Sequence, residues 1–152
     1  MEFEYKVIKP VPALVDFVES FWMLTNHLET AKEIVVLPDG RFDIIFSYSS
    51  AEPYQVALIG LSSEAEQTVF SPKAVMFAVS LKLLAIECLL DIKAAALLNT
   101  AHPLPVDFWG IEKSDLTNFD TFCEKVSAKM LSLIKPNKIG RASCRERVCQ
   151  YV

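Results

Sequence analysis

Glycine, histidine and the common catalytic motifs are scarce in this sequence. The chain of 152 residues has four glycines, which lie too far apart to form a Gly-rich phosphate-binding loop. Its two histidines, His27 and His102, are far apart, and the pair of His27 and Glu29 is too small a set for a metal site. Neither a G-x-S-x-G nor an H-E-x-x-H motif occurs. We therefore expect no enzymatic activity, no catalytic residue, no metal and no cofactor.

Arginine is also scarce, because three of the four arginines lie in the last segment, Ile139 to Val152. This segment contains "IGRASCRERV", which resembles a translated sequencing adapter. We interpret residues 139–152 as a non-native tail and residues 1–138 as one domain; a basic native tail is the alternative. Residues 1–138 hold 12 Lys and Arg against 18 Asp and Glu, a net charge of −6, whereas the whole chain has −4. With Arg41 as its one arginine, this domain is not expected to bind DNA by itself.

A disulfide framework and a targeting segment are missing as well. Two of the four cysteines lie in the tail, and the others, Cys88 and Cys123, are expected to be packed free thiols. This cysteine usage predicts a reducing compartment, and no signal-peptide pattern opens the chain. The most apolar region, Ala74 to Ala101, contains four charged residues and is not expected to span a membrane. We expect a soluble, cytoplasmic protein.

What the chain does have is a globular composition, with 52% hydrophobic and 22% charged residues. Its first half is typical of strands separated by turns: "EYKVIKP", "YQVALIGL" and "QTVFSPKAVMFAVSL", whereas "ALVDFVESFWML" fits either a strand or a helical turn. In "VVLPDGRFDIIF", Asp39 and Gly40 separate two apolar runs, a pattern that predicts a hairpin turn. We therefore interpret both as turn residues, and Asp39 as structural rather than catalytic.

The second half is predicted to be mainly helical. "KLLAIECLL" and "DIKAAALLN" favour short buried helices, and "HPLPVDFWG" is expected to be a loop. An amphipathic helix should begin near Thr117-x-x-Asp120 and end before Pro136. Its apolar stripe comprises Phe119, Phe122, Val126, Met130, Leu133 and Ile134. Strands followed by helices within one domain predict the α+β class.

Aromatic side chains are concentrated in the predicted strands. Such a set can line a small-molecule pocket, because these sites are mostly apolar. We therefore predict a ligand-binding set of Trp22, Phe42, Phe46 and Tyr48. Packing in the core is the alternative for each of the four.

A Trp in "FVESFW" precedes "LPDGRFDIIF", an "IGL" strand, "LLN" and then "PVDFWG" before a long helix. This order of motifs resembles the N-terminal domain of AraC-type bacterial transcription regulators. The resemblance runs from about Tyr5 to Pro136 and is most specific from Leu37 to Phe46. This sequence departs from the family's pattern of a Gly, an aromatic or arginine-rich strand and a Pro-Gly before a short helix. It has "FAVSLKLLAIECLL", with Ala78, Leu83 and Leu84 at the comparable places.

The resemblance implies a cupin-like β-structure that senses a small-molecule effector, pairs subunits as a homodimer, or does both. It also implies a helix-turn-helix domain through which the regulator binds DNA, and we expect this chain to end before that domain. Catalytic cupins carry clustered metal-binding histidines, so the resemblance implies binding without enzymatic chemistry. Two alternatives stay open: a small cupin-like enzyme and an interaction module without a ligand.

Overall fold

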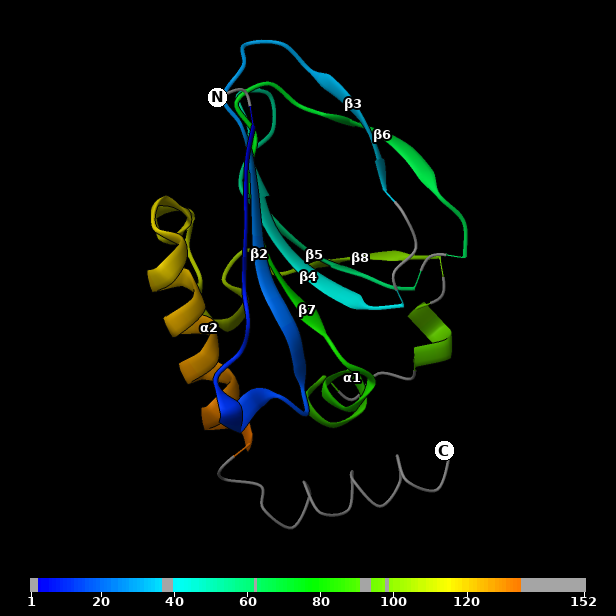
Figure 1. The fold of residues 1–152 in the computed structure, drawn as a ribbon, viewed down its shortest axis with the longest axis vertical. Helices are drawn as coiled ribbons and strands as arrows, with labels where there is room; N and C mark the ends of the chain where they lie inside the picture. Colours follow the sequence, from blue (N-terminus) through cyan, green and yellow to red (C-terminus); the bar gives the residue numbers. More distant parts are fainter. Residues whose placement is uncertain (1–2, 37–39, 62, 91–93, 98, 135–152) are drawn as a thin grey trace.

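The computed structural model describes residues 3–36, 40–61, 63–90, 94–97 and 99–134. Their strands form two antiparallel sheets, one with the order β1-β2-β7-β4-β5-β8 and one that pairs β3 with β6 (Figure 1). The strands are β1 (Phe3–Ile8), β2 (Val18–Asn26), β3 (Lys32–Val36), β4 (Phe42–Tyr48), β5 (Gln55–Ile59), β6 (Glu66–Phe70), β7 (Val75–Leu81) and β8 (Ala101–Leu104).

The helices of the described residues mostly follow the strands, which confirms the predicted α+β class. They are α1 (Leu83–Leu89), α2 (Phe119–Ile134) and short 3-10 turns at Pro12–Leu14, Ala94–Leu97, Phe108–Gly110 and Lys113–Thr117. The prediction that "HPLPVDFWG" is a loop is wrong in part, because its first residues belong to β8, which pairs with β5. No helix in this part of the chain has both the length and the apolar character needed to cross a bilayer.

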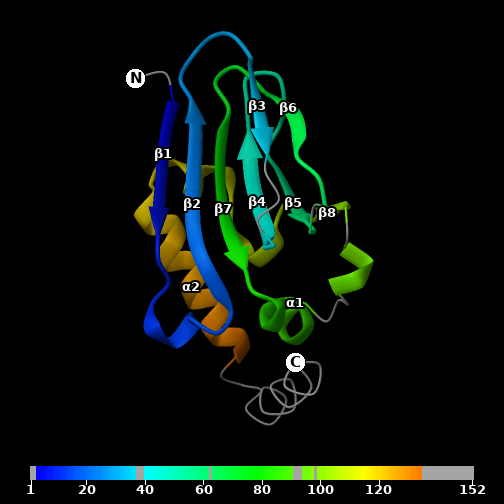
Figure 2. The same ribbon diagram turned by 45° about the vertical axis from the view of Figure 1, so that its right-hand side comes forward.

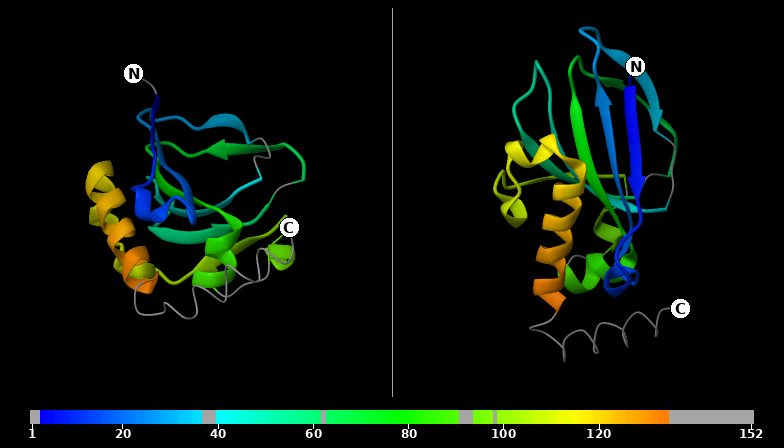
Figure 3. Two further views of the ribbon diagram at one scale, coloured as in Figure 1. Left: turned by 60° about the horizontal axis from the view of Figure 1, so that its bottom comes forward. Right: turned by 60° about the vertical axis from the view of Figure 1, so that its left-hand side comes forward.

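The core lies between the six-stranded sheet and α2, which runs along one face of it (Figure 3). The Phe122 ring packs edge-on against Phe46 and against Phe77, each with centroids 5.3 Å apart. Val126 and Met130 are fully buried on the same side of the helix. Because successive strand residues point to opposite faces, every second residue of the central strands joins this core. We call this the outer face of the sheet.

Helix α2 ends as the sequence predicts, but its cap differs from the expected one. Asn118 has an extended backbone, and its Oδ1 accepts a hydrogen bond from the backbone N–H of Thr121 at 3.1 Å, the usual geometry of an N-cap. The predicted stripe is buried except for Leu133, which is half-buried. Cys123 is buried as well, so the packed-thiol prediction for it is confirmed.

The strands on either side of Gly40 do not pair with each other as a hairpin. Gly40 has φ +72°, the left-handed conformation that glycine adopts without strain; Asp39 lies outside the described residues. However, β3 pairs with β6, whereas β4 pairs with β5 and β7. The hairpin prediction is therefore wrong: this segment passes from one sheet to the other.

The small sheet faces the side of the large sheet opposite α2 (Figures 1 and 2). Several contacts connect this region to the large sheet. The rings of Phe3 on β1 and Phe70 on β6 stack with centroids 6.1 Å apart. The buried Asn26 amide donates hydrogen bonds to the carbonyl oxygens of Thr30 at 3.2 Å and Ser71 at 3.0 Å. We call the face of the large sheet that looks toward β3 and β6 the inner face.

At the end of β5, the backbone of Gly60 lies close to the backbone of the segment before β8. The Gly60 N–H donates a hydrogen bond to the Thr100 carbonyl at 2.9 Å. A Cβ atom built on Gly60 would lie 1.5 Å from the Leu97 carbonyl oxygen. Only glycine therefore allows the 3-10 turn at Ala94–Leu97 to pack here.

Candidate functional site

The inner face is apolar but less covered than the outer face. On β4, Ile44 and Phe46 of the outer face are fully buried, whereas Ile45 between them is half-buried. A similar alternation recurs along β2 and β5, whereas β7 is buried on both faces from Phe77 to Leu81. The half-buried apolar residues of the inner face are Trp22, Leu24, Ile45, Ala57, Ile59 and Met76. Helix α2 thus seals one face, while β3 and β6 leave the other accessible to solvent.

A polar cluster lies within this apolar face. The indole Nε1 of Trp22 donates a hydrogen bond to Oδ1 of Asp43 at 3.4 Å. The Ser80 hydroxyl donates a short hydrogen bond to the same oxygen. The three residues come from β2, β4 and β7, which are adjacent in the sheet. Asp43 is therefore held between two donors, as an acceptor on a largely apolar surface.

The small side chain of Ala78 allows this cluster to form. Trp22 lies opposite Ala78 on β7, and Ala78 lies opposite Ile45 on β4. The indole must cross β7 to reach Asp43, and a methyl group at position 78 leaves room for it. Ala78, which departs from the pattern of the resembled family, lies within β7.

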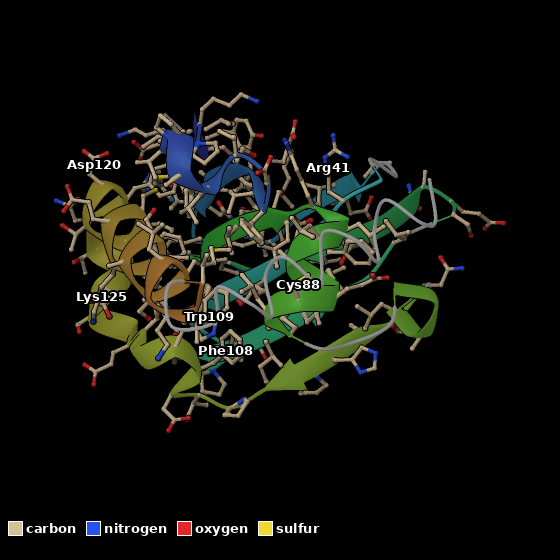
Figure 4. The ribbon with its side chains drawn as sticks, turned by 90° about the horizontal axis from the view of Figure 1, so that it is seen from below. Arg41, Cys88, Phe108, Trp109, Asp120 and Lys125 are labelled. Atoms are coloured by element: carbon tan, nitrogen blue, oxygen red, sulfur yellow. The ribbon has the colours of Figure 1, made fainter. Side chains whose placement is uncertain are left out.

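Charged side chains continue from this cluster toward the end of the sheet near α1. A bulge in β2 interrupts its pairing with β7 between Val18 and Ser20. The Glu19 carboxylate at this bulge lies 3.5 Å from Arg41 Nη2 and 3.9 Å from Lys82 Nζ. Figure 4 shows Arg41 at the rim of the molecule in the view from below. Since bulges re-aim side chains, this one directs an acid toward these cations.

The four residues of the predicted ligand-binding set do not lie together. Trp22 is on the inner face, whereas Phe42 and Phe46 are buried on the outer face at 3% and 0% exposure. Tyr48 is half-buried, with the Lys113 ammonium 4.6 Å from its ring centroid. Phe42 and Phe46 thus lie in the core, the alternative stated for them. A ligand-binding role for Trp22 stays a prediction.

Sequence reasoning missed Asp43 and Ser80 as site residues. The signal for Asp43 was a charged residue inside the strand "RFDIIF". Ser80 gave no signal of its own, because its role depends on the register that places it opposite Asp43. The weak pair of His27 and Glu29 is not brought together: His27 bonds Thr25 at 3.1 Å, and Glu29 lies 3.4 Å from Lys73.

Two hollows open elsewhere on the surface. One of about 180 Å³ lies at the tip of the β4–β5 hairpin and includes Ser47, Tyr48 and Gln55. The other, about 390 Å³, lies on the outer face where α2 begins. Its floor includes Phe77 and Phe119, and its rim includes Lys6, His27 and Asp120. Neither contains the Trp22 and Asp43 cluster.

The segment before α2 is tied to the sheet and the helix. The Tyr54 hydroxyl donates to the Ile111 carbonyl at 3.0 Å, and burial, reinforced by Asp115 and Glu112, raises the pKa of Tyr54 to about 12. Burial also acts to raise the pKa of Asp115, but hydrogen bonds from Lys125 and from the Glu112 backbone outweigh it and lower that pKa. The rings of Phe108 and Trp109, labelled in Figure 4, stack in the same segment with centroids 4.8 Å apart.

No reactive centre is evident among the described side chains. In this part of the chain no group of three or more His, Cys, Asp or Glu is placed to hold a metal ion. Burial, with the nearby charge of Asp120, raises the pKa of the Cys123 thiol to about 12. That thiol is therefore protonated at neutral pH and a poor nucleophile.

Comparison with known proteins identifies a family but no activity. No curated protein and no solved structure matches the chain. A family model described as a domain of unknown function, DUF6597, matches residues 6–103. The match runs from within β1 to within β8, so it includes the Trp22 and Asp43 cluster. Because it covers more than half of the sequence, this chain belongs to the DUF6597 family.

Proposed function

We propose that this domain is the effector-sensing part of an AraC-type transcription regulator. The effector is a small molecule that binds on the inner face of the six-stranded sheet. The observation that carries the proposal is the half-open apolar face with the Trp22 and Asp43 cluster in it. Small-molecule sites combine an apolar surface with a few placed polar groups in this way. The resemblance in "FVESFW" and "LPDGRFDIIF" supplies the regulatory context, because both motifs contribute to this cluster.

The chemistry of the cluster narrows the class of effector. An indole face stacks on a sugar or aromatic ring, and an ionised carboxylate only accepts hydrogen bonds. The proposed effector is therefore a small ring compound that carries a hydroxyl or amino donor for Asp43. In this proposal the domain adopts a cupin-like arrangement, works in the cytoplasm, has no catalytic role and reaches DNA through a separate helix-turn-helix domain.

A thermal-shift screen with monosaccharides and hydroxylated aromatic acids tests the proposal. A compound that binds only the folded state raises the melting temperature, by an amount that grows with its concentration. We expect such a compound to lose its effect on Trp22→Ala and on Asp43→Ala but to keep it on Trp109→Phe. A shift that is equal in all variants would place the site elsewhere. Turnover of the bound compound would point instead to the enzymatic alternative.

A further inference from the structure

Strand β1 is an open edge of the six-stranded sheet. It pairs with β2 over its full length without a register shift, and no other strand of the described residues pairs with its outer side (Figure 2). Two large apolar side chains on its inner face, Tyr5 and Val7, are 64% and 48% exposed. A regular, partly apolar edge of this kind presents free backbone groups to another strand.

The charges on β1 are self-complementary in one antiparallel register. Glu4 and Lys6 flank Tyr5 on the outer face, 3.5 Å apart within the chain. If two copies of β1 pair about Tyr5, each Glu4 lies opposite the other copy's Lys6. If the centre of the pairing moves by one residue, Glu4 of one copy lies opposite Glu4 of the other, or Lys6 lies opposite Lys6. Opposite charges at cross-strand positions stabilise pairing and like charges oppose it.

We propose that two copies of this chain pair through β1, antiparallel and centred on Tyr5, so that their six-stranded sheets form one continuous sheet. The contact is isologous, as expected for a two-fold dimer. On the inner face Tyr5 meets the second copy's Tyr5, and Phe3 meets its Val7. The apolar side chains that β1 now exposes are thereby covered. This pairing does not depend on the proposed effector, so either proposal can fail without the other.

The second edge of the same sheet is less suited to pairing. Strand β8 has four residues, and one of them is Pro103, which lacks a backbone donor. Lys6 on β1 could act as a charge that guards the edge, a common device against aggregation. In the register centred on Tyr5, however, Lys6 meets a carboxylate. The charge on Lys6 thus opposes the neighbouring register centred on itself and favours the register centred on Tyr5.

Sedimentation of the full chain under reducing conditions, over a wide concentration range, tests the pairing. We expect a reversible dimer in the wild type. Glu4→Lys and Lys6→Glu each create two like-charge contacts and should weaken the dimer about tenfold or more. The double variant Glu4→Lys with Lys6→Glu restores opposite charges and should regain wild-type association. A wild type that stays monomeric at the highest concentration would overturn the proposal.

Mixing the two single variants gives a second test. Glu4→Lys carries two lysines on β1 and Lys6→Glu carries two glutamates, so each should prefer the other to itself. Native mass spectrometry should detect mainly the mixed dimer. Lys129→Glu, an equal charge change on the exposed side of α2, is the matched control and should dimerise like the wild type. Loss of the dimer in Lys129→Glu alone would assign the interface to α2 and overturn the proposal.

Discussion

The Trp22 indole donates its hydrogen bond to Asp43 across the whole width of β7, over the small side chain of Ala78. Three strands are thus connected on one face by side chains, in addition to their backbone ladders. The aromatic ring and the carboxylate hold each other in a fixed orientation. In the proposed function, such ordering before the effector arrives lowers the entropic cost of binding it.

The first prediction concerns this hydrogen bond. Trp22→Phe removes the donor but keeps an aromatic ring, and it should lower the free energy of unfolding by about 1 to 2 kcal/mol. Trp109→Phe is the control, because a Phe at that position can still stack on Phe108. Urea unfolding followed by circular dichroism measures both. Equal stability in the two variants would show that the Trp22 and Asp43 contact contributes nothing.

The second prediction concerns the turn before β4. Gly40 has a positive φ, and a Cβ atom there would meet nothing within 4 Å. Backbone strain alone should therefore set the cost of substitution. Gly40→Val should destabilise by at least about 1 kcal/mol, whereas Gly40→Asn should cost less because Asn tolerates this conformation. Chemical denaturation compares the two, and a Val variant as stable as the Asn variant would contradict this reasoning.

The third prediction concerns Gly60, where steric space rather than backbone conformation should set the cost of substitution. Gly60→Ala places a methyl group against the Leu97 carbonyl and should cost about 2 kcal/mol or more, since the turn must move to accommodate it. Gly110 has φ +70° but open space around it, so Gly110→Ala should cost only about 1 kcal/mol. Thermal unfolding of the two variants tests the difference. If Gly60→Ala were the more stable variant, the turn at Leu97 could move at little energetic cost.

The fourth prediction concerns alkaline pH. Tyr54 has a pKa raised from 10.0 to about 12 in the folded chain, so the unfolded chain loses this proton first as the pH rises. The stability that the neutral hydroxyl contributes is fully present below pH 10 and is lost between about pH 10 and 12. Tyr54→Phe lacks this titration. The difference in unfolding free energy between wild type and variant should therefore shrink across that range, and a constant difference would exclude the linkage.

The fifth prediction follows from charge. The chain without its last 14 residues has a net charge of −6 and one arginine. It should show no salt-dependent affinity for duplex DNA, because such binding requires clustered cations that neutralise phosphates. Fluorescence anisotropy of labelled DNA at several salt concentrations measures this. An affinity that falls steeply with salt would locate DNA binding in this domain.

Local sequence determined the type of most elements. The spacing of the apolar residues predicted the position of α2. Its N-cap, Asn118, lies one residue from the predicted Thr117. Alternating apolar residues and turn signals identified most strands. Gly40 was recognisable as a turn because a positive φ depends on the residue itself. These features require only neighbours along the chain, so short segments contain the necessary information.

Only the tertiary structure decided which strands pair and which face each side chain meets. The pairing of β3 with β6 instead of β4 depends on contacts between distant segments. Phe42 and Phe46 differ from Trp22 because α2 covers the outer face of the sheet. Asp43 becomes a site residue only through Trp22 and Ser80 on two other strands. A strand's alternation divides its side chains into two sets, but the packing of the other elements determines which set is buried.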